Sequence, residues 1–398
     1  MKRRLITRKR IERWIVLSCV PIVLLLRLIR PLVWVRFGWL QTHKIGHLPL
    51  EVELYLCERK AGIQPQDTID LFFDRRRGDG KVCNQFAMNM ADRSVRIFPW
   101  AKFLAGANEK LPHPERHAIY IKAREQNSVR DKDGLFSRFP VQIPLTPAEE
   151  ERGAALLTSL GVPAGSRYVC LHVRNSLYWK TRDSTMSSDS DFRNSDIRSF
   201  SQAVRALIDA GFYVVQIGFP AEISIDILDP RYIDYSRSAR SDFMDIYLAA
   251  HCYLMISTGS GMDSISYMFR RPILMCNLAP LSFVFSDKEN IVNLPKLYRR
   301  TGAAHFMTFR DAIASGAGSF VTTEEFNAAG IEVHEARPEV IRDAVLEMID
   351  KIEGTWQDST EDSARQHAFW HLLRNHPLHG EIRGHISTVY LRAYSQLL

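Results

Sequence analysis

Two short stretches of the chain carry residue types that bind phosphate. The first is Ser257-Thr258-Gly259-Ser260-Gly261, which follows an apolar run and precedes a helical pattern. Glycines let a backbone approach a ligand closely, the first N–H groups of a helix favour an anion, and the hydroxyls of Thr258 and Ser260 add donors. This stretch therefore predicts a phosphate site. The alternative is a tight turn that only joins a strand to a helix.

The second stretch is His172-Val173-Arg174, at the end of another strand-like run. The carboxyl ends of parallel strands meet at one edge of a sheet, and strand alternation puts His172 and Arg174 on one side. An arginine there can clamp a diphosphate with bidentate hydrogen bonds. His172 is either a partner for a base or sugar, or a core or capping histidine. Gly218 ends the next strand-like run, and Arg193 either faces the anion or lies on the surface.

Other motifs for phosphates and metals are missing or weak. The P-loop string GxxxxGK[ST] does not occur. Gly259-x-Gly261-x-x-Ser264 falls short of the dinucleotide fingerprint, and no acid closes the next strand, which argues against a nicotinamide dehydrogenase. The string at 189–191 has the DxD form, but it lies in a polar Ser/Asp-rich stretch, so we predict no metal site. The six cysteines form no CxxC pair, which indicates a reducing compartment without disulfides.

Strand-like and helical patterns alternate along most of the chain, which predicts an α/β protein with parallel sheets. We expect a membrane-associating segment over residues 1–30 and a first α/β domain over 31–150. A second α/β domain follows over 151–355, and helices over 356–398 pack back on the first domain. Thr146, with Pro147 and Glu149 after it, predicts a capped helix start, and residues 193–211 predict a helix capped by Asn194 or Ser195.

The positive charge of the chain is concentrated near its N-terminus. The chain has a net charge of +7, and residues 1–60 hold thirteen Lys and Arg against four Glu. No nucleic-acid-binding fold is apparent, so we expect no nucleic-acid partner. The apolar run 14–26 is shorter than the 20 or so residues of a spanning helix and contains Pro21. A basic, apolar segment of this kind favours contact with a membrane surface at the cytoplasmic face. A spanning signal anchor and a core helix are the alternatives.

The order of these motifs resembles a family of bacterial glycosyltransferases with a GT-B-type donor domain. The resemblance covers about residues 31–395 and is strongest over 167–277, from the strand ending in HVR to STGSG and RRPILMCN. It implies two Rossmann-like domains facing a cleft. More distantly, the HVR segment is similar to fucosyltransferases that use GDP-fucose. By that similarity His172 touches the nucleotide, Arg174 holds the β-phosphate, Asp245 or Asp242 binds the base and Ser260 binds phosphate.

A transferase of this kind needs an acceptor, which we expect in the first domain. His47, in the loop 43–47 between a strand and a helix, is the candidate general base that takes the proton of an acceptor hydroxyl. A helix-capping or solvated histidine is its alternative. Glu51 is a reserve base, and Asn84 and Gln85 are candidates for binding a sugar.

The sequence thus predicts an inverting or retaining transferase that moves a sugar from a nucleotide-sugar donor to a glycan or lipid-linked acceptor at the inner membrane. Breaking a glycosyl–phosphate bond leaves a charged diphosphate, which Arg174 and a helix N-terminus could stabilise without metal or other cofactor. Two other classes stay open: a sugar-nucleotide epimerase or hydrolase, and a non-catalytic nucleotide- or glycan-binding subunit.

Overall fold

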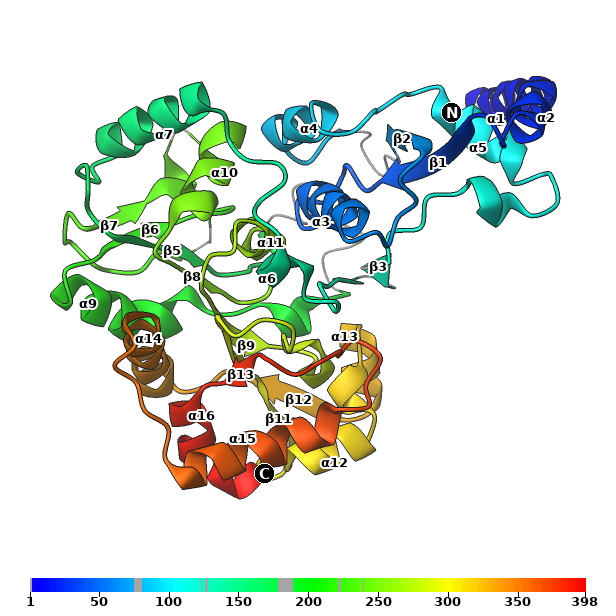
Figure 1. Ribbon diagram of the computed structural model, residues 1–398. Coiled ribbons are helices and arrows are strands. Elements are labelled where there is room, and N and C mark those ends of the chain that lie inside the picture. The colour runs from blue at the N-terminus through cyan, green and yellow to red at the C-terminus, as the bar shows by residue number, and fades with distance from the viewer. Residues whose placement is uncertain are drawn as a thin grey trace. The chain divides into compact units, whose positions relative to one another are not determined.

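The computed structural model describes residues 2–74, 81–122, 124–125, 128–177, 189–220, 223–238 and 240–398. It consists of two compact units, Met1–Val129 and Arg130–Leu398 (Figure 1). Residues 130–150, which we expected in the first domain, are grouped with the second unit.

The first unit is an α/β layer around one parallel strand pair. Strands β1 and β2 pair over seven residues each, and single bridges from Phe37 to Ala118 and from Phe72 to Ile97 extend the layer on both sides. Gly38 lies at the centre of this layer, where a Cβ atom would come within 3.0 Å of the Ile119 and Phe72 side chains. The elements of this unit are α1 (Lys2–Ser18), α2 (Val20–Leu28), β1 (Trp34–Leu40), α3 (Leu48–Lys60), β2 (Thr68–Asp74), α4 (Gln85–Asp92), α5 (Ala101–Asn108), β3 (Arg124–Glu125) and β4 (Ser128–Val129).

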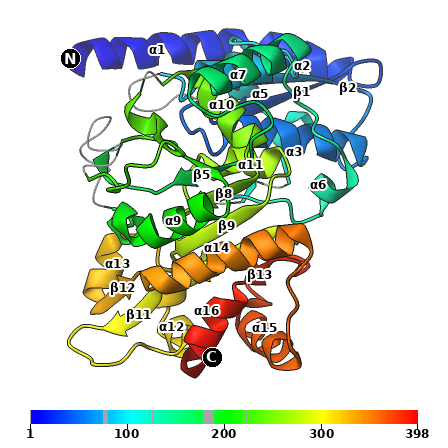
Figure 2. The ribbon, with the colours of Figure 1, turned by 90° about the vertical axis from the view of Figure 1, so that its left-hand side faces the viewer.

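The second unit is built on a seven-stranded sheet in which every pairing is parallel. Helices α9 and α14 pack together on one face, and α10 and α11 pack on the other (Figure 2). Its strands are β5 (Tyr168–His172), β6 (Tyr213–Gln216), β7 (Tyr232–Asp234), β8 (Leu254–Ser257), β9 (Ile273–Leu278), β10 (Ile291–Pro295), β11 (Leu297–Arg300), β12 (Ile331–His334) and β13 (His385–Ile386). Its helices are α6 (Leu135–Arg138), α7 (Pro147–Ser159), α9 (Ser201–Asp209), α10 (Asp242–His251), α11 (Asp263–Met268), α12 (Phe309–Ala314), α13 (Thr323–Ala328), α14 (Pro338–Glu353), α15 (Thr360–Leu373) and α16 (Thr388–Ala393). The predicted α/β class with parallel sheets is confirmed.

The order of the strands fixes where a ligand can bind. The sheet runs β13-β10-β9-β8-β5-β6-β7. The chain therefore builds outward from β5 through β6 to β7, and then crosses to β8 on the other side of β5. Such a reversal opens a crevice at the carboxyl ends of the two central strands, which is the usual ligand site of a doubly wound sheet. Here those ends belong to β5 and β8.

Three local predictions can be compared with the structure. Thr146 and Glu149 form the predicted capping box at the start of α7. The predicted helix over 193–211 is wrong in its first half, because residues Asp191–Arg193 and Ile197–Phe200 form short 3-10 turns and the α-helix begins only at Ser201. Asp196, and neither Asn194 nor Ser195, accepts the capping hydrogen bond there. In the C-terminal segment, β13 pairs with β10 in the second unit's sheet.

The N-terminal helices α1 and α2 are packed against α5 of the first unit. Within the part of the chain that the structure describes, no helix is both long and apolar enough to cross a bilayer.

Candidate functional site

The structure brings the two phosphate-type motifs together at the carboxyl ends of β5 and β8. His172 and Ser257, the last residues of the two strands, are direct register partners. The backbone N–H of Thr258 donates to the carbonyl of His172 at 3.2 Å, and the N–H of Arg174 donates to the Thr258 hydroxyl at 2.8 Å. These bonds lock the residues after each strand to one another, so that both motifs share one site.

His172 is a buried, neutral ring with one unsatisfied nitrogen. Its ring lies against Gly218, where a Cβ atom would come within 2.4 Å of His172 Cδ2 and where φ is +96°. Burial, with Arg240 and Arg174 nearby, lowers the pKa of His172 to about 4. Its Nδ1 atom is buried and has no hydrogen-bond partner in the described structure. A ligand group that bonded this nitrogen would remove the cost of an orphaned buried polar atom.

Arg174 presents a buried charge that forms no ion pair with a described carboxylate, although Asp191 lies near enough to raise its pKa. Its guanidinium donates to the Ser190 carbonyl at 2.9 Å, to the Ser190 hydroxyl at 2.8 Å and to the Asn194 side-chain oxygen. Burial, together with the charge of Arg193, lowers its pKa to about 10, so the group is still protonated at neutral pH.

Two further cations come to the same place from other elements. Arg193 donates to the Gly259 carbonyl at 2.5 Å, and burial lowers its pKa. Lys296, which directly follows β10, donates to the carbonyls of Phe192 and Asn194 at 3.0 and 2.5 Å. Burial lowers the pKa of Lys296 to about 8. Among the described residues, no carboxylate forms an ion pair with Arg174, Arg193 or Lys296. Asp191, Asp263 and Glu335 lie near enough to raise the pKa of Arg174, Arg193 and Lys296, respectively, but burial has the larger effect.

Several N–H and hydroxyl groups of residues 257–261, which the sequence predicts to be available to a phosphate, are already hydrogen-bonded within the protein. The Asp263 carboxylate accepts from the Ser257 hydroxyl at 2.9 Å and from the Ser260 N–H at 2.7 Å. The N–H of Gly259 is within 3.3 Å of the Ser257 hydroxyl, and that of Thr258 already bonds His172. The following helix, α11, has only six residues. The positive charge available to an anion therefore comes from the three cationic side chains rather than from the amides of this loop.

Asp263 is itself electrostatically perturbed. Its side chain is buried, and burial raises its pKa to about 6 despite the hydrogen bonds that favour the charged form. An acid with this pKa loses much of its negative charge when the pH falls slightly below neutral. Its charge opposes anion binding at the same loop that it holds in shape.

The predicted base-binding acid is buried and paired. Asp245 lies in the first turn of α10, is 5 % exposed and accepts from Arg240 at 2.6 Å. Burial raises its pKa. The charge of Arg240 also helps to lower the pKa of His172. Asp242, the alternative, lies at the start of the same helix and is exposed.

The DxD string supports the cationic cluster. Ser190 accepts from Arg174, and the Asp191 carboxylate accepts from the Asn194 amide at 2.8 Å. Within the described ranges, no group of three or more His, Cys, Asp or Glu side chains is arranged to hold a metal ion.

In the first unit, His47 forms a buried dyad with Glu51. Its Nδ1 atom lies 3.1 Å from Glu51 Oε1, and His47 is 8 % exposed. The guanidinium of Arg124, in β3, donates two hydrogen bonds of 3.0 and 2.5 Å to the Glu51 carboxylate. The Gln41 amide nitrogen, which can only donate, also lies 3.2 Å from Nδ1, so Nδ1 faces one acceptor and one donor. The tautomer with its hydrogen on Nδ1, donated to Glu51, leaves the Nε2 lone pair as the base, and it is the arrangement that a general-base histidine requires.

Asn84 and Gln85 have structural roles in α4. The Asn84 side chain accepts from the Ala87 N–H at 2.8 Å as the helix N-cap, and the Gln85 amide donates to Asn89 at 3.0 Å. Nothing in this geometry directs either side chain to a sugar.

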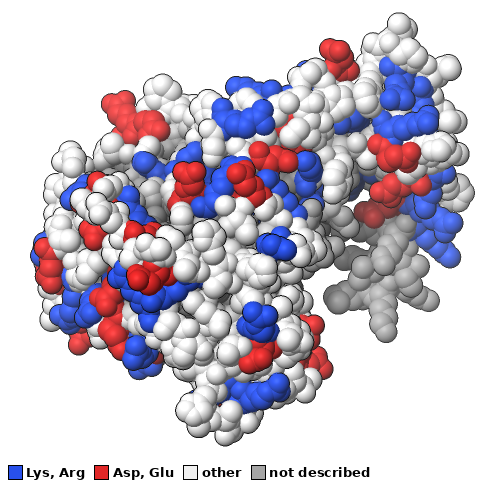
Figure 3. Space-filling model, turned by 60° about the horizontal axis from the view of Figure 1, so that its bottom comes forward, with Lys and Arg blue, Asp and Glu red and all other residues white. Residues whose placement is uncertain are grey.

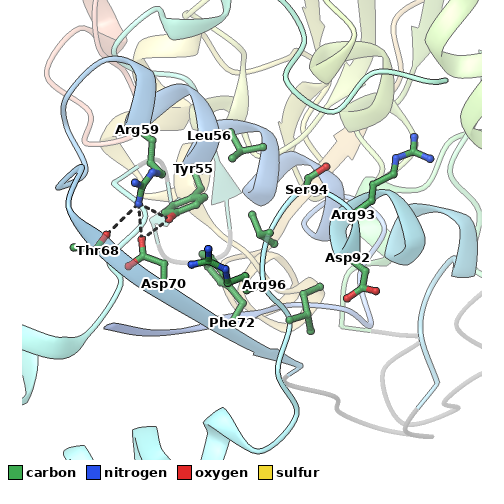
Figure 4. Close-up of a pocket in the computed structure, with 12 residues that line it drawn as sticks. Tyr55, Leu56, Arg59, Thr68, Asp70, Phe72, Asp92, Arg93, Ser94 and Arg96 are labelled. Atoms are coloured by element: carbon green, nitrogen blue, oxygen red, sulfur yellow. Dashed lines mark hydrogen bonds and ion pairs between the residues drawn. The ribbon is translucent and has the colours of Figure 1, made fainter. Parts of the chain in front are cut away.

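The first unit also contains a pocket of about 560 Å³ (Figure 4). Asp70 in its wall accepts from Arg59 at 3.2 Å and also from Tyr55, and Arg36 pairs with it at 2.6 Å. Burial raises the pKa of Tyr55 to about 12. Since α3 returns from the end of β1 to the start of β2, this pocket lies near the strand starts, whereas His47 lies at the strand end. The lining residues are Tyr55, Leu56, Arg59, Thr68, Asp70, Phe72, Asp92, Arg93, Ser94, Val95, Arg96 and Ile97.

Sequence reasoning missed three residues of these clusters. Lys296 carried a usable signal, because it directly follows a strand of the same sheet and so lies at the ligand edge. Asp263 stands three residues after Ser260, a spacing that lets a side chain accept from a backbone N–H. Arg124 lies in a two-residue strand, and nothing in the sequence connects it with Glu51.

Comparisons with known proteins give distant structural likenesses alone. No protein-family model and no curated protein sequence matches the chain. An ADP-heptose LPS heptosyltransferase II from E. coli is 12% identical, with a TM-score of 0.38 over 74% of this chain and 98% of that chain. A glycosyl transferase family 9 structure from Veillonella parvula is 8% identical, with a TM-score of 0.43 over 81% and 97%. The E. coli heptosyltransferase WaaC with ADP-2-deoxy-2-fluoro heptose is 11% identical, with a TM-score of 0.34 over 67% and 93%. Likeness at this level assigns no function, which has to be inferred from the site.

Proposed function

We propose that the chain is a glycosyltransferase that takes a sugar from a nucleotide-sugar donor and passes it to a hydroxyl of a glycan or lipid-linked acceptor. The observation that carries this proposal is the cluster of Arg174, Arg193 and Lys296 beside the carboxyl ends of β5 and β8. Cations whose hydrogen bonds go to neutral oxygens, and which form no ion pair among the described residues, suit a ligand that brings its own negative charge, as a nucleoside diphosphate does.

The donor half of the reaction falls to the second unit. Arg174 binds the diphosphate, with Arg193 beside it, and His172 bonds the nucleoside or sugar through the nitrogen that lacks a partner. When the glycosyl–phosphate bond breaks, its electron pair leaves with the diphosphate. Fixed cations in a buried site stabilise that growing charge without rearranging at the moment of reaction. Asp245, paired with Arg240, is the proposed contact to the base, and the Thr258 and Ser260 hydroxyls complete the donor site.

The acceptor half falls to His47. Its Nε2 atom takes the proton of the acceptor hydroxyl while the oxygen bonds the sugar carbon. Glu51 keeps the ring in the required tautomer and stabilises the imidazolium that forms, and Arg124 keeps Glu51 in place. In this assignment Glu51 is a positioning residue rather than the reserve base.

The first test is a donor screen by thermal unfolding of the full chain with ADP, GDP, UDP, CMP and their sugars. Ligand at about 100 times its Kd should raise the unfolding free energy by about 2.7 kcal/mol. We expect one nucleoside diphosphate to raise the unfolding temperature, and the matching nucleotide sugar to raise it as well. If none of these ligands shifts the unfolding transition, the nucleotide-sugar assignment is wrong.

The same donor then separates the competing activities. A transferase releases the diphosphate faster when an acceptor hydroxyl is present. An epimerase changes the sugar without releasing diphosphate, a hydrolase releases it at the same rate with and without acceptor, and a binding subunit leaves the donor intact. Each of the last three outcomes would reject the transferase proposal.

A further inference from the structure

The N-terminal helices have one face that is fixed to the first unit. Hydrogen bonds from Cys19 N to Ile15 O and from Val23 N to Cys19 O carry the helical backbone from α1 into α2. Val16 packs where Gly106 of α5 has no side chain, at 3.2 Å from a Cβ built there. Val23 is fully buried.

The end of α2 is tied down by polar contacts as well. Leu26 packs on the small core cluster of β1 and α5. Arg27 donates to the Asn108 side chain at 3.1 and 2.6 Å and to the Pro112 carbonyl at 2.5 Å. These helices are therefore part of the folded unit rather than a detached tail.

The opposite face of the same helices is apolar and exposed. The exposed residues recur at helical spacing, as Ile11 with Trp14 and Ile22 with Leu25 and Leu28. Nine of the nineteen large exposed hydrophobic side chains in the described structure lie within residues 11–33. They are Ile11, Trp14, Leu17, Ile22, Leu24, Leu25, Leu28, Leu32 and Val33, with exposed fractions of 54, 72, 47, 52, 50, 57, 77, 86 and 37%. The first seven lie in α1 and α2, and Leu32 and Val33 lie just after the end of α2. We call these nine side chains the apolar face.

The segment that carries the apolar face is strongly positive in sequence. Residues 1–30 contain nine Lys and Arg and one acid, Glu12. Arg10 and Arg13 are exposed on α1. In contrast, the face of the molecule in Figure 3 mixes Lys and Arg with Asp and Glu. A soluble monomer seldom exposes a contiguous apolar patch of this kind, and basic flanks match anionic lipid headgroups.

We propose that the apolar face of α1 and α2 docks on a lipid bilayer that carries anionic headgroups, such as a cytoplasmic leaflet. The helices lie in the plane of the interface, with the apolar side chains among the acyl chains and the basic side chains at the headgroups. Trp14 takes the interfacial position that tryptophan favours. Because the inner face is bonded to α5, docking holds the whole first unit at the bilayer surface. This inference does not depend on the proposed transferase activity.

Flotation of the full chain with lipid vesicles tests this docking. The protein is mixed with vesicles of phosphatidylcholine alone or of phosphatidylcholine with phosphatidylglycerol, and the vesicle-bound fraction is measured at low and high salt. We expect binding to the anionic vesicles that weakens at high salt, since exposed charges are screened. The Leu25→Asp/Leu28→Asp variant should lower the partition coefficient about tenfold or more, because it places two charges among the acyl chains.

The matched control is Leu156→Asp, the same change on an exposed leucine of α7 in the second unit. It should bind vesicles like the parent. The unfolding temperature of each variant shows whether it is folded, and an Arg10→Ser/Arg13→Ser variant gives a second measure through a smaller salt dependence. Docking is refuted if the parent stays unbound with anionic vesicles, or if the folded Leu25→Asp/Leu28→Asp variant binds as the parent does. A concentration-dependent dimer that Leu25→Asp/Leu28→Asp abolishes, without vesicle binding, would assign the apolar face to a second copy and also overturn the proposal.

Discussion

Replacing Arg174 by Gln should weaken donor binding without unfolding the protein. Burial holds the pKa of Arg174 at about 10, against 12.5 for the free side chain. At about 1.36 kcal/mol per pKa unit, keeping this charge in the empty site costs about 3 kcal/mol. A base with a lowered pKa carries this cost at every pH below about 10, so the cost is fully present at neutral pH. Gln removes it.

Gln also loses part of what Arg174 contributes. The guanidinium donates to the Ser190 carbonyl and hydroxyl and to Asn194. Each such bond from a charged donor adds about 1.5 to 3 kcal/mol, and a Gln amide can replace one of them. Losing the other two costs about 3 to 6 kcal/mol, against the gain of about 3 kcal/mol, so at pH 7.5 the unfolding free energy of the unliganded variant should lie about 0 to 3 kcal/mol below the parent value.

Binding should behave differently from stability. A hydrogen bond to a charged group contributes about 1.5 to 3 kcal/mol, so Arg174→Gln should raise the Kd for the nucleoside diphosphate by about 10- to 150-fold. Titration calorimetry gives the Kd, and urea unfolding gives the stability. The control is Arg198→Gln, which removes an exposed guanidinium that pairs only locally with Asp196. An unchanged Kd in Arg174→Gln, or an unliganded variant that loses far more than about 3 kcal/mol, would refute this account of the site.

Three further predictions concern the same clusters. Asp263 has a folded pKa of about 6 against 3.8 in the unfolded chain, so its contribution to stability is complete below pH 3.8 and is lost as the pH rises through 6. Asp263→Asn should therefore reduce the fall in unfolding free energy between pH 4 and 8 by about 3 kcal/mol in urea titrations; the same fall in parent and variant would count against the assigned pKa. His47→Gln should lower the transfer rate about 10²- to 10⁴-fold while the donor Kd stays constant, and a matching loss of donor affinity would argue against a base. Gly218→Ala should lower the unfolding temperature more than Gly165→Ala does, because both have a positive φ but only Gly218 faces the His172 ring; equal losses would mean that the ring contact has no effect.

The sequence was most informative where the shared edge of a parallel sheet determines which residues meet. His172 and Arg174 end a buried strand, and the stretch that begins at Ser257 ends another, so the rule for parallel sheets was enough to expect them together. The register His172 to Ser257 bears this out. The order of the strands, which makes this meeting point the central crevice, could not be derived from the sequence, because alternation of strands and helices does not say which strand crosses to which side.

The rest depended on contacts between distant segments. The predicted helix over 193–211 begins late because Lys296 and Arg174 hold the carbonyls and side chains of 190–194 in a tight non-helical turn. Glu335 accepts from the Asp196 N–H at 2.7 Å and the Ser199 hydroxyl at 2.8 Å, which fixes the next turn. Helix propensity along 193–200 is outweighed by these charged contacts, and no pattern within the segment reveals them.

The same buried charges explain why the site should bind an anion and why it is costly when empty. Arg174, Arg193 and Lys296 all have pKa values lowered by burial, so each would be more stable in water than in the unliganded site. Asp263, the acid at the loop, has its pKa raised by burial, so it also resists carrying charge. A bound diphosphate places negative charge beside the three cations, which offsets the free energy that they lose when they are removed from water. Ligand affinity and the instability of the empty site therefore have one electrostatic origin. A variant that removes a buried charge should reduce the instability of the empty site and also weaken ligand binding.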